Sequence, residues 1–438
     1  MRISIFGLGY VGAVSAGCLA RDGHEVVGCD IDDAKLELFR NGRTPIIEEG
    51  MEALISDAVG SGRLTVTDNT DEALHSTELS FVCVGTPSTP NGGQDLGAVE
   101  RICEQLGSAL RSRTEYHVVV MRSTVLPGTM EEIVRPLLEQ HSGKRVGVEF
   151  GLCFQPEFLR EGSSIKDYDD PPYTVVGSED DRAVEILRRV FSHLPCEFLH
   201  TSTGSAELLK YCCNSFHALK ITFANEIGCI AQSQGVDPHA VMELVCKDRH
   251  LNISPAYLKP GFAFGGSCLP KDLRALMYCA KRTDVETPML AGILPSNRTH
   301  IEHAIDIVLR SNVKSVGMIG LSFKTGTDDL RESPLVALAE RFIGKGLKLS
   351  IHDPAVSLAR LLGANRRFIE ESIPHISSLL TDSCEELIST SQIVIVGIDS
   401  PESVDRLYQL GRDDQIVLDL GNFVQRERIS GRYYGVCW

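Results

Sequence analysis

The sequence lacks an apolar run long enough to cross a bilayer, and its first residues lack the basic region of a secretion signal. It also lacks positive charge, because 43 lysines and arginines stand against 59 aspartates and glutamates, for a net charge of −16. This balance argues against nucleic acid or an anionic membrane as a partner. A negatively charged ligand would therefore need a local cluster of basic groups.

The fourteen cysteines lack the paired CxxC spacing of a zinc site, and many of them lie in apolar, strand-like runs. Cys212 and Cys213 are adjacent, and neighbours on a helix do not easily share a metal ion. We therefore expect reduced thiols in a cytoplasmic protein, with no disulfide framework and no metal site. The 438 residues are too many for one core, so two or three domains are expected.

A glycine-rich motif, GLGYVG at residues 7–12, lies between an apolar strand and a helix, and the next strand ends in Asp30. This order predicts a Rossmann domain that binds a dinucleotide. Gly7 makes the turn, Gly9 lets the backbone approach a pyrophosphate, and Gly12 lets the helix pack on the sheet. Asp30 would accept from a ribose 2′-hydroxyl and repel a 2′-phosphate, so NAD is preferred over NADP. The alternative is a tight turn without a ligand.

Three further residues of this region are candidates for contact with the cofactor or the reacting group. Lys35 lies on the next expected helix, close to Asp30, although a solvated surface lysine is an equally good interpretation. Thr86 and Thr124 follow apolar runs typical of strands buried in a parallel sheet, where ligands lie at the carboxyl ends. The alternative for each threonine is a cap on the turn that follows its strand.

The end of the first domain is rich in charge. Residues 156–162 form a short polar loop that carries Glu161, a second acid and an arginine. The run at 174–177 is expected to be the last strand of the domain. We assign residues 1–202 to this NAD-binding Rossmann domain.

Residues 204–234 contain no proline and predict one long helix with an apolar face. Another face carries Lys210, Asn214, His217 and Asn225, which are one cation, two amides and an imidazole. A solvated face would normally mix glutamate with lysine, so this composition favours hydrogen bonds to a polar ligand. A plain exposed face is the alternative.

A loop rich in glycine and phenylalanine, residues 261–272, places Cys268 and Lys271 just ahead of an expected helix that starts at Asp272. The positive end of the helix dipole and the lysine both favour the thiolate, which is the nucleophilic form of cysteine. Glycines in such a loop let the backbone come close to a ligand. The alternative is a buried structural cysteine in a tight turn.

Alternating strands and helices over residues 311–438 predict a second, Rossmann-like α/β domain. Lys324 follows its first strand, and Arg331 comes shortly after. From these residues alone, both cations are equally well explained as surface salt-bridge partners.

Seven motifs, distributed from end to end, give the chain a resemblance to the UDP-glucose/GDP-mannose dehydrogenase family. They are GLGYVG at 7–12, VGTPS at 84–88, STVLPGT at 123–129, PEFLREG at 156–162, AELLKYCCNSFHALKITFANEIG at 206–228, PGFAFGGSCLPKD at 260–272 and GLSFKTGTDDLRESP at 320–334. The resemblance implies an α/β fold with three parts. These are the N-terminal Rossmann NAD domain (1–202), a central long helix with a helical dimerisation region and the cysteine loop (203–310), and a C-terminal Rossmann-like domain that binds the sugar nucleotide (311–438).

The resemblance also implies a reaction. The C6 hydroxyl of a nucleotide sugar is oxidised to a carboxylate by two NAD, through a thiohemiacetal and a thioester on Cys268. Within the family, the chain is most similar to the enzymes that convert GDP-mannose to GDP-mannuronate for alginate, because of His217, the PGFAFGG wording and the last four residues. UDP-glucose is the alternative substrate. A one-step alcohol dehydrogenase with a structural Cys268 and a non-catalytic NAD or redox sensor are the alternatives of other kinds.

Individual roles follow from the resemblance. Lys210 and Asn214 would stabilise negative charge on the C6 oxygen, and Asp272 would hold a water or Lys210. Glu161 would be the base for thioester hydrolysis, and Thr124 would position water. The implied NAD contacts are Tyr10, Val11, Asp30, Lys35, Thr86, Lys271 and Arg331. The residues implied to line the sugar nucleotide are Glu161, Lys210, Asn214, His217, Asn225, Tyr257, Lys259, Phe262, Gly265 and Lys324.

Three positions depart from the family pattern. Gln155 stands where asparagine is usual, and Ala256 stands where the GDP-mannose enzymes tend to have tyrosine. Lys259 replaces a usual arginine and so loses a bidentate grip on phosphate or hydroxyl groups. These departures bear on sugar specificity more than on the reaction. The resemblance further implies a dimer built on the long helix, in which the loop with residue 259 can reach the site of the neighbouring subunit.

Overall fold

The computed structural model describes residues 1–90, 93–160, 162–254, 256–257, 260–266, 268–323, 330–354, 356 and 379–438. Three candidate site residues, Glu161, Lys259 and Lys324, lie outside the described residues. The chain divides into two compact units, Met1–Ala218 and Leu219–Trp438. No helix in the described part of the chain is long and apolar enough to cross a membrane.

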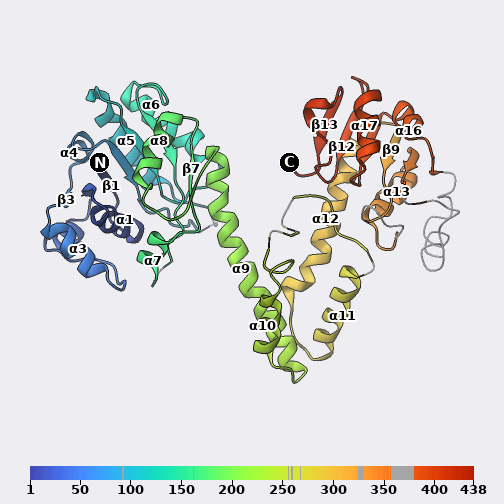
Figure 1. The fold of residues 1–438 in the computed structure, drawn as a ribbon, viewed down its shortest axis with the longest axis horizontal. Coiled ribbons are helices and arrows are strands. Elements are labelled where there is room, and N and C mark those ends of the chain that lie inside the picture. The colour runs from blue at the N-terminus through green and yellow to red at the C-terminus, as the bar shows by residue number, and fades with distance from the viewer. Residues whose placement is uncertain are drawn as a thin grey trace. The chain divides into compact units, whose positions relative to one another are not determined.

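The first unit is built on an eight-stranded sheet in the order β3-β2-β1-β4-β5-β6-β7-β8 (Figure 1). Its strands are β1 (Arg2–Phe6), β2 (Glu25–Cys29), β3 (Leu64–Thr67), β4 (Leu79–Val82), β5 (Val118–Met121), β6 (Gly151–Phe154), β7 (Tyr173–Gly177) and β8 (Glu197–Thr201). Neighbouring strands are parallel except β6 and β7, which are antiparallel. The strand order reverses between β1 and β4, and dinucleotides bind at such a switch point.

Strands β4 and β5 are buried throughout, because the helices of this unit cover both faces of the sheet. They are α1 (Tyr10–Arg21), α2 (Asp33–Arg40), α3 (Met51–Gly60), α4 (Thr70–His75), α5 (Gly97–Ser112), a π-helical turn (Met130–Val134), α6 (Arg135–Ser142), α7 (Ser164–Asp169) and α8 (Asp181–Val190). The side chains of Asp32, Asn69 and Asp180 accept hydrogen bonds from the first turns of α2, α4 and α8. These caps explain where the three helices begin.

The prediction that 174–177 is the last strand of the first domain is wrong. Strand β8 follows it and pairs with β7 in parallel. The residues of β8 are half-buried or exposed, so the strand has no continuous apolar run. That pattern is typical of an edge strand, and a search for buried runs does not find it.

The long helix predicted over 204–234 is α9 (Thr203–Ser233). A buried carboxylate anchors its first turns to the first unit. Glu207 accepts hydrogen bonds from the backbone N–H groups of Gly128 (2.8 Å) and Met130 (2.9 Å). Burial raises the pKa of Glu207. The carboxylate thereby satisfies donors at the start of the helical segment that follows β5.

The second unit contains a five-stranded parallel sheet in the order β10-β9-β11-β12-β13. Its strands are β9 (Ser315–Ile319), β10 (Lys348–His352), β11 (Ile393–Val396), β12 (Ile416–Asp419) and β13 (Arg432–Gly435). Its helices are α10 (Pro238–Lys247), α11 (Leu269–Arg282), α12 (Pro288–Arg310), α13 (Pro334–Gly344), α16 (Cys384–Thr390), α17 (Pro401–Leu410) and the 3-10 turn Arg426–Arg428. The order reverses between β9 and β11, which gives this sheet a switch point of its own.

A second buried carboxylate ties the far end of α9 to the helices of this unit. Glu226 accepts from the backbone N–H groups of Met289 (2.8 Å) and Leu290 (3.0 Å), at the start of α12. Nearby, Ile230 and Leu290 are buried in a small apolar cluster that α9, α11 and α12 share. Two glutamates of α9, one in each unit, therefore accept from the N-terminal N–H groups of other helical segments.

Candidate active site

The glycine-rich turn after β1 has the backbone geometry that its sequence predicts. Gly7 has a φ of +93°, and its N–H donates to the carbonyl oxygen of Cys29 at 2.8 Å. A Cβ on Gly12 would lie 1.8 Å from the carbonyl oxygen of Gly7, so a side chain there would push α1 off the turn. A Cβ on Gly9 would meet nothing within 4 Å. The backbone at Gly9 is therefore open to a ligand.

Asp30, which directly follows β2, fixes this turn through its carboxylate. The residue is 8% exposed, and its Oδ2 accepts from the N–H of Leu8 at 2.7 Å. Its Oδ1 accepts from the N–H of Asp32 at 3.0 Å, and Nζ of Lys35 lies 3.3 Å from Oδ2. An open backbone, a helix N-terminus and an acid after β2 together fit a dinucleotide. Val11, in the first turn of that helix, is half-buried against the core of the domain.

Glu48, which sequence reasoning missed, ties Tyr10 to the loop that follows position 161. The Tyr10 hydroxyl donates to the Glu48 carboxylate, which also accepts from the N–H groups of Gly162 (2.8 Å) and Ser164 (3.0 Å). These donors, with Tyr10 first, lower the pKa of Glu48. Burial, and then the bond to Glu48, raises the pKa of Tyr10. No pattern in the sequence marks Glu48, because it lies in a connecting segment.

Thr86 and Thr124 are brought together at the carboxyl ends of β4 and β5. The Thr86 hydroxyl donates to the carbonyl oxygen of Thr124 at 2.8 Å. The side-chain amide of Gln94 donates to the same oxygen at 3.1 Å and accepts from the N–H of Leu126 at 3.1 Å. The two threonines therefore form one hydrogen-bonded group beside the glycine-rich turn.

Lys210 forms a buried ion pair with Glu157, a second residue that sequence reasoning missed. Nζ of Lys210 lies 2.8 Å from Oε1 of Glu157 and 2.5 Å from its carbonyl oxygen, and the side chains are 10% and 9% exposed. The other carboxylate oxygen accepts from the N–H of Leu159 at 2.8 Å. The ammonium also lies 5.4 Å from the centre of the Phe158 ring. Glu157 follows the proline of the PEFLREG motif, and its place in that motif is the signal by which the sequence could have identified it.

Gln155, one of the departures from the family pattern, serves a buried arginine. Its side-chain oxygen accepts from the guanidinium of Arg122, and its amide donates to the carbonyl oxygen of Pro156 at 3.0 Å. Arg122 is 6% exposed and lies 5.7 Å from the centre of the Phe81 ring. The side-chain amide of Gln155 therefore makes its hydrogen bonds to residues of the first unit.

The remaining polar residues of α9 differ in exposure. Asn214 and His217 are exposed in the first unit, whereas Asn225 is exposed in the second unit. Their exposure leaves them available to a ligand and equally fits a plain solvated face.

Cys268 is the N-cap residue of α11, so the helix begins three residues earlier than expected. The carbonyl oxygen of Cys268 accepts from the N–H of Asp272 at 2.9 Å. The cysteine is exposed, which contradicts the alternative of a buried structural thiol. Lys271 and Asp272 are also exposed and lie 3.1 Å apart (Nζ to Oδ1). In this unit Asp272 therefore pairs with Lys271.

Four other cysteines show the contrast with Cys268. Burial raises the pKa of the thiols of Cys18, Cys83, Cys103 and Cys153 to about 12, so these thiols stay protonated at neutral pH. They lie in the core of the first unit. The exposed position of Cys268 at a helix N-terminus is the one suited to a nucleophile.

The loop before Cys268 is pinned to α12. The N–H of Phe264 donates to Oδ1 of Asn297 at 2.9 Å, and Nδ2 of Asn297 donates back to the carbonyl oxygen of Phe264 at 2.8 Å. Nε2 of His300 lies 2.7 Å from the carbonyl oxygen of Gly261. Phe262 lies beside this histidine, with ring centres 6.2 Å apart. Tyr257 lies before the loop, 85% exposed and with a φ of +62°.

Two glycines let the cysteine loop pack against the segments on either side of 324–329. A Cβ on Gly265 would lie 2.3 Å from the carbonyl oxygen of Glu332. Gly266 has a φ of +85°, and a Cβ there would lie 2.8 Å from the ring of Phe323. Arg331, beside Glu332, is half-buried. The structure thus brings the cysteine loop next to the backbone that carries Arg331.

The turn after β9 repeats the turn after β1, with one difference. Gly320 has a φ of +105°, and its N–H donates to the carbonyl oxygen of His352 at 2.8 Å. Oδ2 of Asp353 accepts from the N–H groups of Leu321 (2.8 Å) and Ser322 (3.0 Å). Ser322 is fully buried and donates its hydroxyl to the same oxygen at 3.0 Å. It occupies the place that Gly9 has in the first turn.

Most of the chain matches one family. Residues 1–195 match the NAD binding domain of the UDP-glucose/GDP-mannose dehydrogenase family, residues 204–299 its central domain and residues 317–426 its UDP binding domain. The chain belongs to the UDP-glucose/GDP-mannose dehydrogenase family. It is an NAD-dependent dehydrogenase, and its α/β fold has the N-terminal NAD-binding domain, the central helices and the C-terminal domain that the sequence predicts.

Individual relatives span the chain from end to end. A GDP-mannose 6-dehydrogenase of Pseudomonas aeruginosa is 48% identical over 438 residues, which are 100% of both chains. The UDP-glucose 6-dehydrogenase AglM of Haloferax volcanii is 34% identical over 97% of this chain and 98% of its own. The crystal structure of a ternary complex of GDP-mannose dehydrogenase from Pseudomonas aeruginosa has a TM-score of 0.95, with 48% identity and full coverage of both chains.

Proposed function

We propose that this dehydrogenase oxidises the C6 hydroxyl of GDP-mannose to a carboxylate and so makes GDP-mannuronate, a precursor of alginate. The observation that carries the proposal is identity over the full length. Six GDP-mannose 6-dehydrogenases are 47–49% identical over the whole chain, whereas two UDP-glucose 6-dehydrogenases are each 34% identical. UDP-glucose is the second candidate because the motifs of the reaction are shared.

The oxidation removes four electrons in two steps, with Cys268 holding the intermediate. Bound NAD supplies the hydride acceptor for each step. Loss of the first hydride from C6, with the hydroxyl proton, gives an aldehyde. The Cys268 thiolate then adds to the aldehyde carbon, and the former carbonyl oxygen takes a proton to give a thiohemiacetal. Loss of the second hydride from C6, with the hydroxyl proton, gives a thioester. Water then breaks the C–S bond and releases the carboxylate and the thiolate.

Lys210 is suited to stabilise charge on the C6 oxygen. Its ion pair with Glu157 fixes the direction of the buried amine before the substrate binds. Asn214 lies one helical turn further along α9 and is exposed. We propose that protons are moved and water is placed by three further groups, Asp272, Glu161 and Thr124. Asp272 pairs with Lys271 near Cys268.

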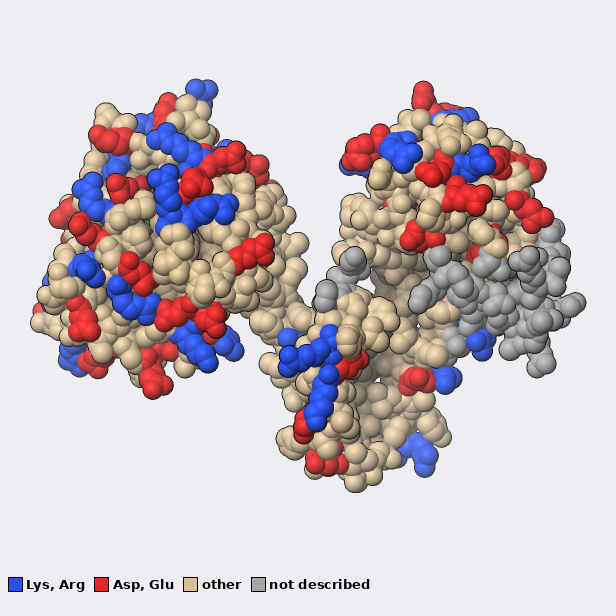
Figure 2. Space-filling model, viewed as in Figure 1, with Lys and Arg blue, Asp and Glu red and all other residues tan. Residues whose placement is uncertain are grey.

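We infer that the chain forms a homodimer through its central helices. Large apolar side chains are exposed along this region, namely Leu208, Phe216, Leu219, Ile221, Val236, Leu244, Leu251, Ile253, Leu269 and Tyr278. On the face shown in Figure 2, charges of both signs are mixed over the α/β domains, whereas the part of α9 next to the first domain is uncharged. Exposed apolar side chains gathered in one region are typical of a contact surface between protein chains. The many reduced thiols support a cytoplasmic location.

The test is the amount of NADH formed per sugar nucleotide consumed, with GDP-mannose and UDP-glucose side by side. Two NADH on GDP-mannose, and a Cys268→Ser variant that releases no acid, would support the whole scheme. Two NADH on UDP-glucose would keep the mechanism and change the substrate. One NADH, with activity retained by Cys268→Ser, would replace the scheme by a one-step alcohol oxidation. NAD binding without turnover of either sugar would favour a sensor.

A further inference from the structure

The loop between β6 and α7 is anchored to two other parts of the first unit. Near its start, the carbonyl oxygen and the carboxylate of Glu157 contact the ammonium of Lys210 on α9. Near its end, two backbone N–H groups donate to the carboxylate of Glu48, which lies between α2 and α3. The hydroxyl of Tyr10, in the glycine-rich turn after β1, donates to the same carboxylate. One loop therefore connects the glycine-rich turn to the Lys210 amine.

Glu48 is suited to this place because an ionised carboxylate offers only acceptors. Its Oε2 accepts from the Tyr10 hydroxyl and from the N–H of Gly162 at 2.8 Å, and its Oε1 accepts from the N–H of Ser164 at 3.0 Å. The three donors come from two segments that are distant in the sequence. A glutamine of the same size would turn an NH2 donor toward one of them. Hydrogen bonds to a charged acceptor are also stronger than those to a neutral one.

A different carboxylate, that of Asp167, holds the loop in its own shape. It accepts from the N–H and the guanidinium of Arg160 and from the hydroxyl of Ser163, all within seven residues. The Tyr10 hydroxyl also lies 3.4 Å from the carbonyl oxygen of Arg160, which is too long for a strong hydrogen bond. The shape of the loop therefore depends on Asp167, and its attachment to the glycine-rich turn depends on Glu48.

The turn that Glu48 contacts is the one that fits the cofactor. Tyr10 is the first residue of α1, and N–H groups at the start of a helix receive a pyrophosphate. Asp30, after β2, marks the adenosine side of the switch point between β1 and β4. The other half of a dinucleotide extends across such a switch point, toward the side of the sheet where the loop after β6 begins.

We propose that Glu48 is a positioning residue, which holds the loop between β6 and α7 against the NAD turn and so sets the place of the Lys210 amine relative to the bound cofactor. The part that concerns Lys210 rests on the proposed function. The part that concerns NAD rests on the turn and on the match of residues 1–195 to an NAD binding domain. A turn and a loop that are ordered before NAD arrives lose less entropy on binding, so Glu48 contributes to NAD affinity without touching NAD.

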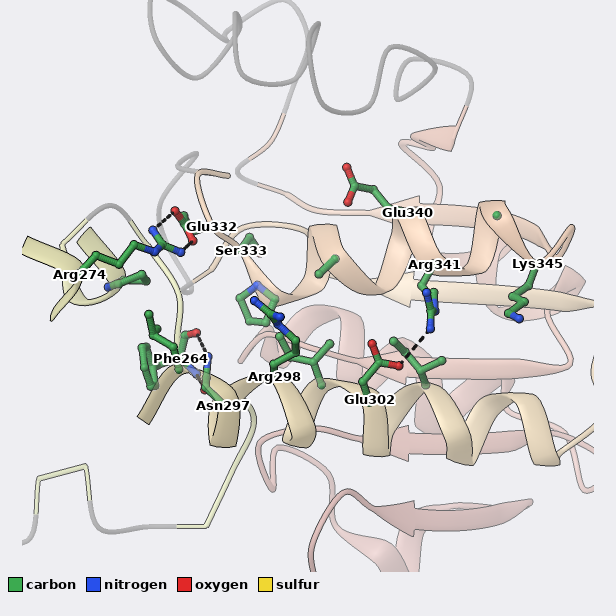
Figure 3. A pocket seen from close by; sticks show the side chains of 17 residues that line it. Phe264, Arg274, Asn297, Arg298, Glu302, Glu332, Ser333, Glu340, Arg341 and Lys345 are labelled. Carbon is green, nitrogen blue, oxygen red and sulfur yellow. Dashed lines mark hydrogen bonds and ion pairs between the residues drawn. The ribbon is translucent and has the colours of Figure 1, made fainter. Parts of the chain in front are cut away.

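The opposite edge of the same sheet contains a matched control. Tyr116, just ahead of β5, donates its hydroxyl to the carboxylate of Asp180, which also accepts from two backbone N–H groups at the start of α8 (3.0 and 3.3 Å). The parts are again a half-buried tyrosine, a carboxylate and two N–H groups, but ligands of such sheets bind at the other edge. Glu302 controls for the change of glutamate to glutamine, because it forms an exposed pair with Arg341 in the second unit (3.4 Å, Figure 3).

The experiment measures the NAD Kd by calorimetry on the full chain without sugar nucleotide, and hydrogen exchange of the loop amides. Glu48→Gln and Tyr10→Phe are each expected to raise the NAD Kd about three- to tenfold, as loss of a charge-assisted hydrogen bond would. The double variant should be no worse than Glu48→Gln, because both changes act on one interaction. The amides of Gly162 and Ser164 should exchange faster in Glu48→Gln.

Kinetics with the sugar nucleotide complete the test. In Glu48→Gln, kcat should fall at least about tenfold while the KM for the sugar nucleotide stays within about twofold, because the amine is displaced and the sugar contacts remain. Tyr116→Phe, Asp180→Asn and Glu302→Gln should leave the NAD Kd and kcat unchanged, although Asp180→Asn should lower the Tm.

A Glu48→Gln variant with NAD Kd and kcat within about twofold of the wild type would overturn the proposal. Equal losses in Glu48→Gln and Asp180→Asn would do so as well, because they would reflect stability alone, and so would multiplying effects of Tyr10→Phe and Glu48→Gln. If Glu48→Gln does not fold, Tyr10→Phe decides against Tyr116→Phe. A rise in NAD Kd of about threefold in Tyr10→Phe alone would support the proposal, and equal Kd values would overturn it.

Wild-type protein that binds NAD but oxidises no sugar nucleotide would end the proposed function. The NAD Kd and the amide exchange of the variants would still decide whether Glu48 holds the loop to the NAD turn.

Discussion

The Nζ atom of Lys210 lies 2.8 Å from Oε1 of Glu157, and both side chains are nine-tenths buried. The same amine contacts the carbonyl oxygen of Glu157. A buried cation with a single carboxylate partner depends strongly on that partner, because removing it leaves an uncompensated charge. Glu157 therefore affects both the stability of the first unit and the position of the proposed catalytic amine.

Glu157→Ala is expected to lower the free energy of unfolding by about 3 kcal/mol, because it leaves the ammonium of Lys210 buried and unpaired. Urea denaturation followed by circular dichroism measures this change. The matched control is Glu243→Ala, which breaks the exposed Lys247–Glu243 pair (2.9 Å) and should cost less than about 0.5 kcal/mol. Similar losses in the two variants would mean that the Lys210–Glu157 pair is not buried in solution.

Two glycines of the first turn should separate NAD binding from folding. Gly9→Ala adds a Cβ in open space, with a φ of −73° that alanine tolerates, so stability should be unchanged while NAD binding falls at least tenfold. Gly12→Ala places its Cβ 1.8 Å from a backbone oxygen, so both stability and NAD binding should be lost. Calorimetry with NAD and thermal unfolding of the two variants measure the effects. Tight NAD binding by Gly9→Ala would contradict a pyrophosphate at this turn.

Gly265→Ala should destabilise the second unit by about 2 kcal/mol, because the carbonyl oxygen of Glu332 would have to move away from the new Cβ. Turnover should fall with it, since the cysteine loop and the Arg331 segment would separate. Gly344→Ala is the control, because a Cβ at the end of α13 meets nothing within 4 Å. It should change stability by less than about 0.5 kcal/mol. Chemical denaturation compares the two, and an equal response would mean that the loop does not pack on Glu332.

His117 should make the protein less stable in acid. Burial lowers its pKa to about 3, and its Nε2 lies 2.7 Å from Oγ of Ser80. The unfolded state binds a proton near pH 6.5, whereas the folded state binds it only near pH 3. The free energy of unfolding is therefore unaffected by the titration of His117 above pH 6.5, and it decreases as the pH falls from 6.5 toward 3. At pH 5 the loss is about 2 kcal/mol.

His117→Gln should remove this part of the pH dependence, so the difference in unfolding free energy between pH 7 and pH 5 should shrink by about 2 kcal/mol relative to the wild type. Replacing the exposed His303 by glutamine should leave the difference unchanged. Denaturation curves at the two pH values decide. A wild-type difference retained in His117→Gln would show that other groups cause it.

The sequence predicts the elements that carry strong local patterns. The Gly7–Gly12 turn, Asp30, the proline-free α9 and the position of Cys268 before a helix all follow from spacing and composition. Each of these features is set by residues that are close together in the chain.

The sequence does not predict pairings between distant segments. Glu48, Glu157 and Glu332 reach partners 38, 53 and 58 residues away, and an isolated glutamate carries no mark of its future partner. Strand β8 was missed because an edge strand has no buried run. Within the first unit Lys210 pairs with Glu157, a partner that the sequence does not indicate.

The two sheets of this chain contain the same turn with different contents. Gly9 leaves a gap in the first, and in the second Ser322 closes that gap with its own hydroxyl. A pyrophosphate can approach the backbone of one turn and not of the other, so the two nucleotide sockets are not interchangeable. At the second turn a side chain, that of Ser322, stands where the first turn has none, and a side chain can be replaced by substitution. Cofactor recognition depends on a bare backbone, where almost any substitution is excluded.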